Sequence, residues 1–277
     1  MLKRIITGTC LVLFLLIPSF LFMDTLFLPA MLALLSAIGV FEMLRCIGQQ
    51  KNYLLAIPAY LVALAAPFGA YYADIQKQFF PAALITVVLS MFFLLSLCVF
   101  LPEKNTPNSV ALTFLLCTYV VVGFCSVGFL AKNEDAKLIY PMIFLGSFVT
   151  DVFCYFTGIL FGKHKLIPRI SPHKTIEGSI GGTVCCMFAF LLYGFAISRF
   201  FDCKADYFAL AVTGFILALI SQLGDLIASS VKRCFGVKDY GKIFPGHGGV
   251  MDRFDSFIAV AGFLAIISTQ LKIDFFH

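Results

Sequence analysis

The sequence predicts an all-α, polytopic integral membrane protein, and three observations support this fold class. Hydrophobic residues make up 61% of the chain and charged residues only 13%, whereas a soluble domain carries roughly 25% charged residues. The apolar residues form runs of about 20, the length that an α-helix needs to cross a bilayer. These runs show no apolar–polar alternation, which excludes the strands of a membrane barrel. Because hydrocarbon offers the backbone no hydrogen bonds, only helices remain as spanning elements.

Hydropathy along the chain predicts about nine membrane spans. The predicted spans are 5–23, 26–44, 53–73, 79–101, 109–131, 138–162, 176–198, 206–231 and 251–271. We interpret the first as a retained span, because no Ala-x-Ala-like cleavage site follows it. We expect two regions: 1–131 as a scaffold with lipid and dimer contacts, and 138–277 as a catalytic region with cytoplasmic loops.

The distribution of basic residues predicts the orientation. If the N-terminus lies in the cytoplasm, 14 of the 20 lysines and arginines fall on the cytoplasmic side and 6 on the other. The positive-inside rule therefore places the N-terminus inside and the C-terminus outside. Nine of the 14 come from two connections, 163–174 and 232–253. This density exceeds what a scaffold needs, so we expect the active site to face the cytoplasm. The short chain without a long polar N-terminal extension suits the inner (cytoplasmic) membrane of a bacterium, and an organellar membrane is the alternative.

A polar stripe ends the eighth predicted span. Gln222, Asp225, Ser229 and Lys232 recur at i, i+3, i+7 and i+10, and so lie on one face of the helix. An ionisable residue such as Asp225 inside an apolar run is costly and marks a functional site by default. The alternative is an aspartate that caps a neighbouring helix or lies among the headgroups.

The loop after this span has the composition of a phosphate-binding turn. Lys232-Arg233 and Lys238-Asp239 supply charge, and His247-Gly248-Gly249 supplies backbone that an anion can approach. An ordinary turn would also explain the glycines.

Acidic residues follow at the start of the ninth predicted span, where Asp252-Arg253-Phe-Asp255 places two carboxylates in or near the first turn. They could simply complement the helix dipole. Together with Asp225, however, they favour a Mg²⁺ site, which needs one or two carboxylates besides water and phosphate oxygens. Asp225 and Asp252 are expected at the same ends of consecutive antiparallel helices, facing each other across the loop.

A second charged connection follows the sixth predicted span. Pro172 is expected to fix a turn and Glu177 to open the seventh helix, while Lys174 and Glu177 are candidates to bind phosphate, base or metal. A basic loop that only sets topology, with one capping glutamate, is the alternative. The glycines behind Glu177 are expected to allow close helix packing; they are Gly178, Gly181 and Gly182.

The run from Ser229 to Asp255 resembles the complete signature of the phosphatidate cytidylyltransferase (CDP-diacylglycerol synthase) family. It reads Ser-x-Val-Lys-Arg-x4-Lys-Asp-x-Gly-x2-Phe-Pro-x-His-Gly-Gly-Val-x-Asp-Arg-Phe-Asp without a mismatch. Gln222-Leu-Gly-Asp225, and Ser-Pro-x-Lys-Thr-x-Glu-Gly from position 171, are also similar to the family pattern. The resemblance covers roughly 138–271. One departure is Val-Phe-Cys between Asp151 and Tyr155, where the family has small residues.

The resemblance implies transfer of CMP from CTP to phosphatidate, in a membrane-bound homodimer that binds no nucleic acid. It implies Mg²⁺ at Asp225 and Asp252, with K⁺ as the candidate second cation and Asp255 in support. The resemblance also implies that Lys232, Arg233, Lys238 and Arg253 bind phosphates, and that Lys174 and Glu177 orient the nucleotide. It implies that Gly248 and Gly249 lie against the triphosphate. The other implied site residues are Ser229, Asp239, His247, Asp151 and Tyr155. His247 is expected to be structural or a phosphate donor.

Three other classes of protein handle similar ligands or share a similar composition. The CDP-alcohol phosphotransferases carry an Asp-Gly-x2-Ala-Arg run that is absent here. A CTP-dependent lipid kinase could share charged helix ends, but it would release CDP instead of pyrophosphate. A transporter would place its ionisable residues near the midplane and often within repeats, whereas here they gather at one predicted face.

Overall fold

The computed structural model describes residues 17–72, 80–132, 135–201, 203–244, 248–269 and 275–276. The chain divides into two compact units. The first comprises Met1–Lys132 and Phe235–Arg253, and the second comprises Asn133–Cys234 and Phe254–His277. The units differ from the two predicted regions in one segment, because the charged loop before the last helix belongs with the N-terminal helices.

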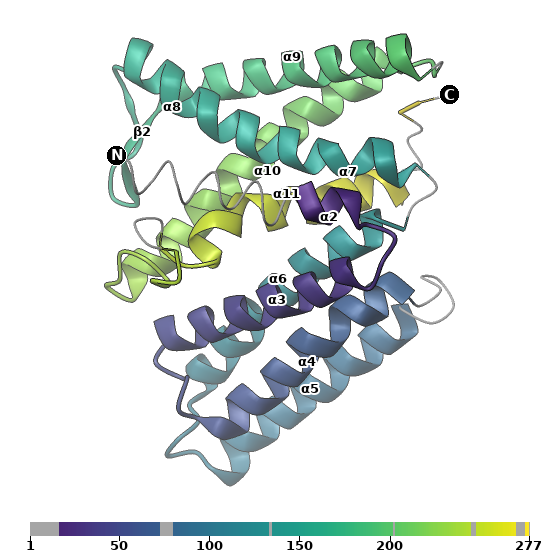
Figure 1. Ribbon diagram of the computed structural model, residues 1–277. Coiled ribbons are helices and arrows are strands. Elements are labelled where there is room, and N and C mark those ends of the chain that lie inside the picture. The colour runs from purple at the N-terminus through teal and green to yellow at the C-terminus, as the bar shows by residue number, and fades with distance from the viewer. Residues whose placement is uncertain are drawn as a thin grey trace. The chain divides into compact units, whose positions relative to one another are not determined.

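The first unit is a bundle of helices (Figure 1). α3 (Phe27–Cys46) packs on α4 (Tyr53–Tyr72) and on α6 (Pro107–Leu130). α4 also packs on α6, and α5 (Phe80–Phe100) lies against α6. Pro58 and Pro67 lie inside α4 without ending it, as membrane helices tolerate. Thr106 caps α6 by accepting a hydrogen bond from the Ser109 amide, a standard helix start. A short helix, α2 (Ile17–Leu21), precedes α3 in the chain.

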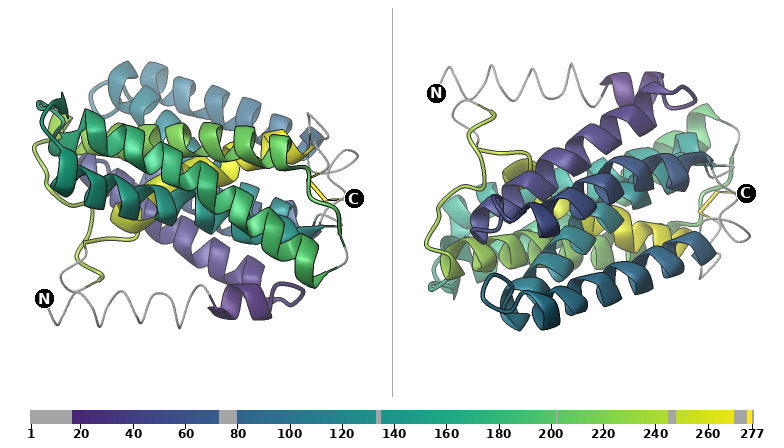
Figure 2. Two further views of the ribbon diagram at one scale, coloured as in Figure 1. Left: turned by 90° about the horizontal axis from the view of Figure 1, so that it is seen from above. Right: turned by 90° about the horizontal axis from the view of Figure 1, so that it is seen from below.

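The second unit contains α7 (Ala136–Phe144), α8 (Thr150–Phe161), α9 (Ile176–Phe200) and α10 (Tyr207–Cys234). α9 packs between α8 and α10, as the left view of Figure 2 shows. The last helix, α11 (Met251–Thr269), begins at the end of the first unit and continues in the second. Within the second unit its Ala259 lies against Gly224 of α10.

A π-helical turn, η3 (Leu145–Val149), joins α7 to α8 and interrupts the sixth predicted span. Gly146 in this turn allows close packing, because a Cβ there would lie 3.0 Å from Val260 and 3.2 Å from Leu217. Such turns occur frequently at functional sites. Here the turn immediately precedes the helix that carries Asp151.

Close packing of α8 against α9 confirms the role predicted for the glycines of the seventh span. A Cβ on Gly178 would lie 2.7 Å from the Cys154 carbonyl oxygen, and one on Gly181 would lie 2.6 Å from Thr157. Any larger side chain would push the helices apart. The bulky Phe153 does not separate them, since it is 40% exposed and is not among the atoms next to these glycines.

The connection between α8 and α9 is a β-hairpin, β1 (Lys165–Ile167) with β2 (Ser171–Thr175). The strands are antiparallel and pair Lys165 with Thr175 and Ile167 with Ser171. The prediction that Pro172 fixes a turn was therefore wrong, because this proline lies within β2. A two-stranded ribbon has only edge strands, where a missing N–H is tolerated.

Seven helices of the described part are long and apolar enough to cross a membrane. They correspond to the second through eighth predicted spans and establish an all-α, polytopic membrane fold. The first predicted span, 5–23, lies mostly outside the described residues. The ninth forms as α11, but it carries charged residues in its first two turns and is not among the seven. The spanning helices are Phe27–Cys46, Tyr53–Tyr72, Pro81–Phe100, Pro107–Leu130, Ala136–Phe161, Ile176–Phe200 and Tyr207–Cys234.

Candidate active site

In the first unit, Asp252 organises the loop that precedes it. Its Oδ2 atom accepts hydrogen bonds from the backbone amides of Tyr240, Gly241 and Gly249, with donor–acceptor distances of 2.7, 3.4 and 2.9 Å. The Asp252 residue is buried, at 8% exposure. Three amide donors satisfy much of the hydrogen-bonding capacity of that oxygen. Asp252 therefore shapes the loop, whatever else it binds.

The glycines of this loop are required for a reason that the sequence did not reveal. Gly248 has φ +88°, a region that favours glycine, and a Cβ there would lie 2.7 Å from Asp252 Oδ2. Gly241 and Gly249 both lie directly against the carboxylate of Glu42 on α3, which occupies the space a Cβ would need. The role predicted for Gly248 and Gly249, to admit a triphosphate, stays a prediction.

Glu42 is a site residue that the sequence reasoning missed. It is fully buried in α3 and accepts hydrogen bonds from the backbone amides of Val250 (3.1 Å) and Met251 (2.8 Å) at the start of α11. The available signal was the one used for Asp225, an acidic residue inside an apolar span.

Arg45, one turn after Glu42 on α3, forms a further hydrogen bond with the same loop. Its guanidinium donates to the carbonyl oxygen of Tyr240 and lies 5.7 Å from the Phe41 ring centroid. Tyr240 thus has its amide bound to Asp252 and its carbonyl bound to Arg45. From the sequence, Arg45 was only a cytoplasmic charge that sets orientation.

In the second unit, Asp225 of α10 pairs with Lys174 of β2. The Lys174 Nζ to Asp225 Oδ2 distance is 2.7 Å, and the side chains are 24% and 31% exposed. The contact is an ion pair rather than an aligned hydrogen bond, since the ammonium meets no hydrogen-bond geometry with a described residue. Ser229, one turn along α10, donates to Asp225 Oδ1 at 3.2 Å. The structure therefore brings together residues predicted from two separate connections.

Two more aspartates of the second unit, Asp151 and Asp255, lie in the polar cluster that includes Asp225. Asp151 of α8 accepts a hydrogen bond from the Ser256 hydroxyl at 3.0 Å. Asp255 of α11 is 7% exposed and interacts electrostatically with Asp225, Asp151 and Lys232. Acidic groups from α8, α10 and α11 therefore lie near one another, and Lys232, itself 9% exposed, lies near Asp255.

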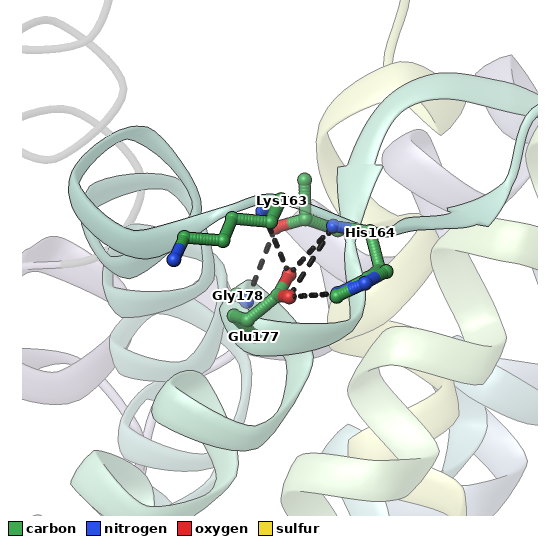
Figure 3. Close-up of polar contacts among 5 residues, drawn as sticks. Lys163, His164, Glu177 and Gly178 are labelled. Carbon is green, nitrogen blue, oxygen red and sulfur yellow. Dashed lines mark hydrogen bonds and ion pairs between the residues drawn. The ribbon is translucent and has the colours of Figure 1, made fainter.

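Glu177, at the start of α9, binds the segment between α8 and β1 (Figure 3). Its carboxylate accepts hydrogen bonds from the backbone amides of Lys163 and His164 at 3.1–3.2 Å and lies 2.6 Å from His164 Nδ1. Beside it, Thr175 caps the helix by accepting from the Gly178 amide at 3.1 Å. Glu177 does open the seventh helix as predicted. Its role in orienting a nucleotide stays a prediction.

The remaining predicted site residues fall into three groups. Arg233, Lys238, Asp239 and Arg253 are exposed, and Arg233 Nε also donates to the Ile170 carbonyl of the hairpin at 3.4 Å. Tyr155 is 65% exposed and packs edge-on against Phe156; no described contact brings it into the cluster. His247 lies outside the described residues.

The prediction that Asp225 and Asp252 share Mg²⁺ stays a prediction, because the two residues belong to different units. Within the described residues, no three His, Cys, Asp or Glu side chains are placed to hold a metal ion. A Mg²⁺ site needs only one or two carboxylates, with water and substrate phosphate as further ligands. The donor chemistry fits, since both groups offer the hard oxygen atoms that Mg²⁺ prefers.

The fold is that of a polytopic membrane protein. Its clusters of acidic and basic side chains suit phosphate-bearing ligands. The chain belongs to the cytidylyltransferase family, whose model matches residues 2–271. This finding confirms the resemblance seen in the sequence.

Curated relatives agree with this assignment. The chain is 34% identical over 264 residues to a phosphatidate cytidylyltransferase of Staphylococcus haemolyticus, with 95% of this chain and 92% of the relative covered. It is 36% identical over 217 residues to one of Staphylococcus saprophyticus, covering 78% of each chain. It is 40% identical over 186 residues to one of Staphylococcus aureus, covering 67% of this chain and 69% of the relative.

Proposed function

We propose that this chain transfers CMP from CTP to phosphatidate, giving CDP-diacylglycerol and pyrophosphate for phospholipid biosynthesis. The observation that carries the proposal is the family match over residues 2–271, with relatives named phosphatidate cytidylyltransferase. The uninterrupted signature from Ser229 to Asp255 supports it.

The proposed reaction is a substitution at phosphorus. A phosphate oxygen of phosphatidate attacks the α-phosphorus of CTP, the new P–O bond forms, and the bond to the β-phosphate breaks as pyrophosphate leaves. The attacking monoester is largely ionised at neutral pH, because its second pKa is about 6 by analogy with phosphorylated side chains. A general base is therefore not required. The main demand is to bring two polyanions together and to neutralise their charge.

The basic residues of the two connections are suited to this task. We assign Lys232, Arg233, Lys238 and Arg253 to the phosphates of CTP and phosphatidate. Lys174 is held by Asp225, where it is available to a phosphate once that carboxylate binds another cation. The hydrogen bonds around Glu177 support a role in placing Lys174, three residues earlier in the chain.

We further propose that Asp225 and Asp252 ligate Mg²⁺, with K⁺ as the candidate second cation. Bound Mg²⁺ would supply positive charge to the phosphate oxygens. This assignment rests on the sequence signature and on the oxygen chemistry of the two side chains.

The topology proposed from the sequence is nine spans with the N-terminus in the cytoplasm and the active site facing the cytoplasm at the inner membrane. It is supported by the 14-to-6 distribution of basic residues. We also propose a homodimer, as the family resemblance implies.

Purified protein in detergent, supplied with labelled CTP, phosphatidate and Mg²⁺, tests the activity. We expect CDP-diacylglycerol and one pyrophosphate per turnover, and no product after chelation of Mg²⁺. Release of CDP together with a phosphorylated lipid would instead identify a CTP-dependent kinase and refute the proposal. An Asp225→Asn variant purified in parallel excludes a contaminating activity.

A further inference from the structure

We propose that Glu42 of α3 is a positioning residue. It holds the loop that precedes α11 and thereby fixes the position of Asp252. The proposal deepens the proposed function and rests on it for its kinetic consequence. Its structural part stands on hydrogen bonds within the first unit.

The start of α11 depends on Glu42 for its hydrogen bonds. The first amides of a helix have no partner within the helix and need an outside acceptor. Val250 and Met251 are 1% and 0% exposed, so water does not serve them. Both amides donate to Glu42 instead. A carboxylate at this end of a helix also complements the helix dipole. Glu42 thus acts as an N-terminal cap supplied by another helix.

Three glycines make room for this contact. Gly241 and Gly249 on the loop leave space for the Glu42 carboxylate itself. On α3, a Cβ at Gly39 would lie 3.1 Å from the Met251 sulfur and 2.9 Å from Val120. Both α3 and the loop therefore carry glycine where the two meet, which a chance contact would not require.

The contact fixes the residue that follows it in the chain. Asp252 comes directly after Met251, and its Oδ2 atom gathers the amides of Tyr240, Gly241 and Gly249. Glu42 therefore holds the start of α11, and Asp252 holds the loop before it. Arg45 adds a bond to Tyr240. No step of the reaction needs Glu42 to touch substrate, because it acts through the position of Asp252.

The test combines amide exchange with kinetics on the full chain in detergent. In Glu42→Gln one carboxylate oxygen becomes an amide donor that cannot accept from a backbone N–H; in Glu42→Ala both acceptors are lost. We expect hydrogen–deuterium exchange of the Val250 and Met251 amides to rise about tenfold or more in Glu42→Ala, since these buried amides then lose their acceptor. Glu42→Gln should show a smaller rise.

The kinetic expectation is a raised half-saturating CTP concentration in both variants, larger in Glu42→Ala, with a smaller fall in kcat. Ser36→Ala is the matched control. Ser36 is fully buried in the same helix, and its hydroxyl has no hydrogen-bond partner among the described residues. It should match wild type in exchange and in kinetics.

Unchanged exchange at Val250 and Met251 in the glutamate variants would overturn the proposal. Equal changes in Ser36→Ala would also overturn it, because they would indicate general loosening of α3. If Glu42→Ala cannot be purified as folded protein, the exchange of Glu42→Gln decides. Failure of the proposed function appears separately, as wild-type protein that makes no CDP-diacylglycerol while the exchange result still holds.

Discussion

Glu42 and Asp252 of the first unit have a different role from Asp225 of the second unit. In the first unit, Glu42 and Asp252 are buried and bind five backbone amides between them. In the second unit, Asp225 is about one-third exposed and pairs with the Lys174 ammonium. Buried carboxylates that bind backbone build the loop, because moving them would leave amides without partners. A partly exposed carboxylate with a side-chain cation can exchange that cation for another.

The largest expected effect separates these two kinds of aspartate. Asp225→Asn and Asp252→Asn should each lower turnover by about 10³-fold, as for lost charge stabilisation of a transition state. Only Asp252→Asn should also raise amide exchange at Tyr240, Gly241 and Gly249. Product assays with labelled CTP and exchange measurements on the same preparations test both statements. Normal turnover in both variants would remove the metal role, and normal exchange in Asp252→Asn would remove its role in the loop.

Lys174→Ala should lower turnover by about 10²-fold, because a cation near the phosphates is lost. The same change should lower the Mg²⁺ concentration at half-maximal rate, since Lys174 no longer competes for Asp225. A Mg²⁺ titration at saturating CTP measures this. Lys165→Ala, an exposed lysine of the same hairpin, is the control and should leave the Mg²⁺ dependence unchanged. A higher Mg²⁺ requirement in Lys174→Ala would show that the lysine assists metal binding instead.

Gly249→Ala should destabilise the protein by about 1–3 kcal/mol, the usual cost of overpacking, because the added methyl group meets the Glu42 carboxylate. Gly128→Ala in α6 is the control, since its Cβ would lie in ordinary contact at 3.4 Å from Leu32. The chain has no tryptophan, so thermal unfolding is followed by a thiol-reactive dye at the buried Cys117 and Cys125. Equal midpoints for the two variants would contradict the packing described here.

The smallest expected effect is at the hairpin. Glu177→Ala should reduce turnover by less than about fivefold, because exposed charged pairs contribute little, and should make the hairpin more sensitive to limited proteolysis. His164→Ala should do less, since the two backbone amides keep their acceptor. A loss as large as that of Lys174→Ala would mean that Glu177 contacts substrate.

The sequence predicted what depends on composition and on side-chain chemistry. Apolar runs predicted the seven spanning helices, and the glycines behind Glu177 predicted the close approach of α8 and α9. The pairing of Lys174 with Asp225 joins residues predicted from two connections. Each of these features depends on the residues of a single segment or on the attraction between opposite charges.

What the sequence did not predict depends on contacts between distant segments. Glu42 is 208 residues from Val250 in sequence, so no local pattern connects them. The hairpin is not evident from the sequence, because Pro172 favours a turn at a position where β2 forms. The π turn at Leu145–Val149 leaves no periodic signature in an apolar run where every position is hydrophobic or small.

The π-helical turn η3 sets the angular position of the residues of α8, which follows it in the chain. A π turn closes its hydrogen bonds over five residues where an α-helix uses four, so the chain rotates less per residue there than the about 100° of an α-helix. If the same residues of Leu145–Val149 were wound as a regular α-helix, Asp151 would be rotated away from the Ser256 hydroxyl that it now meets. The sixth span therefore consists of two α-helical segments joined by a turn of different winding, and the direction of Asp151 depends on that winding as well as on its position in the sequence.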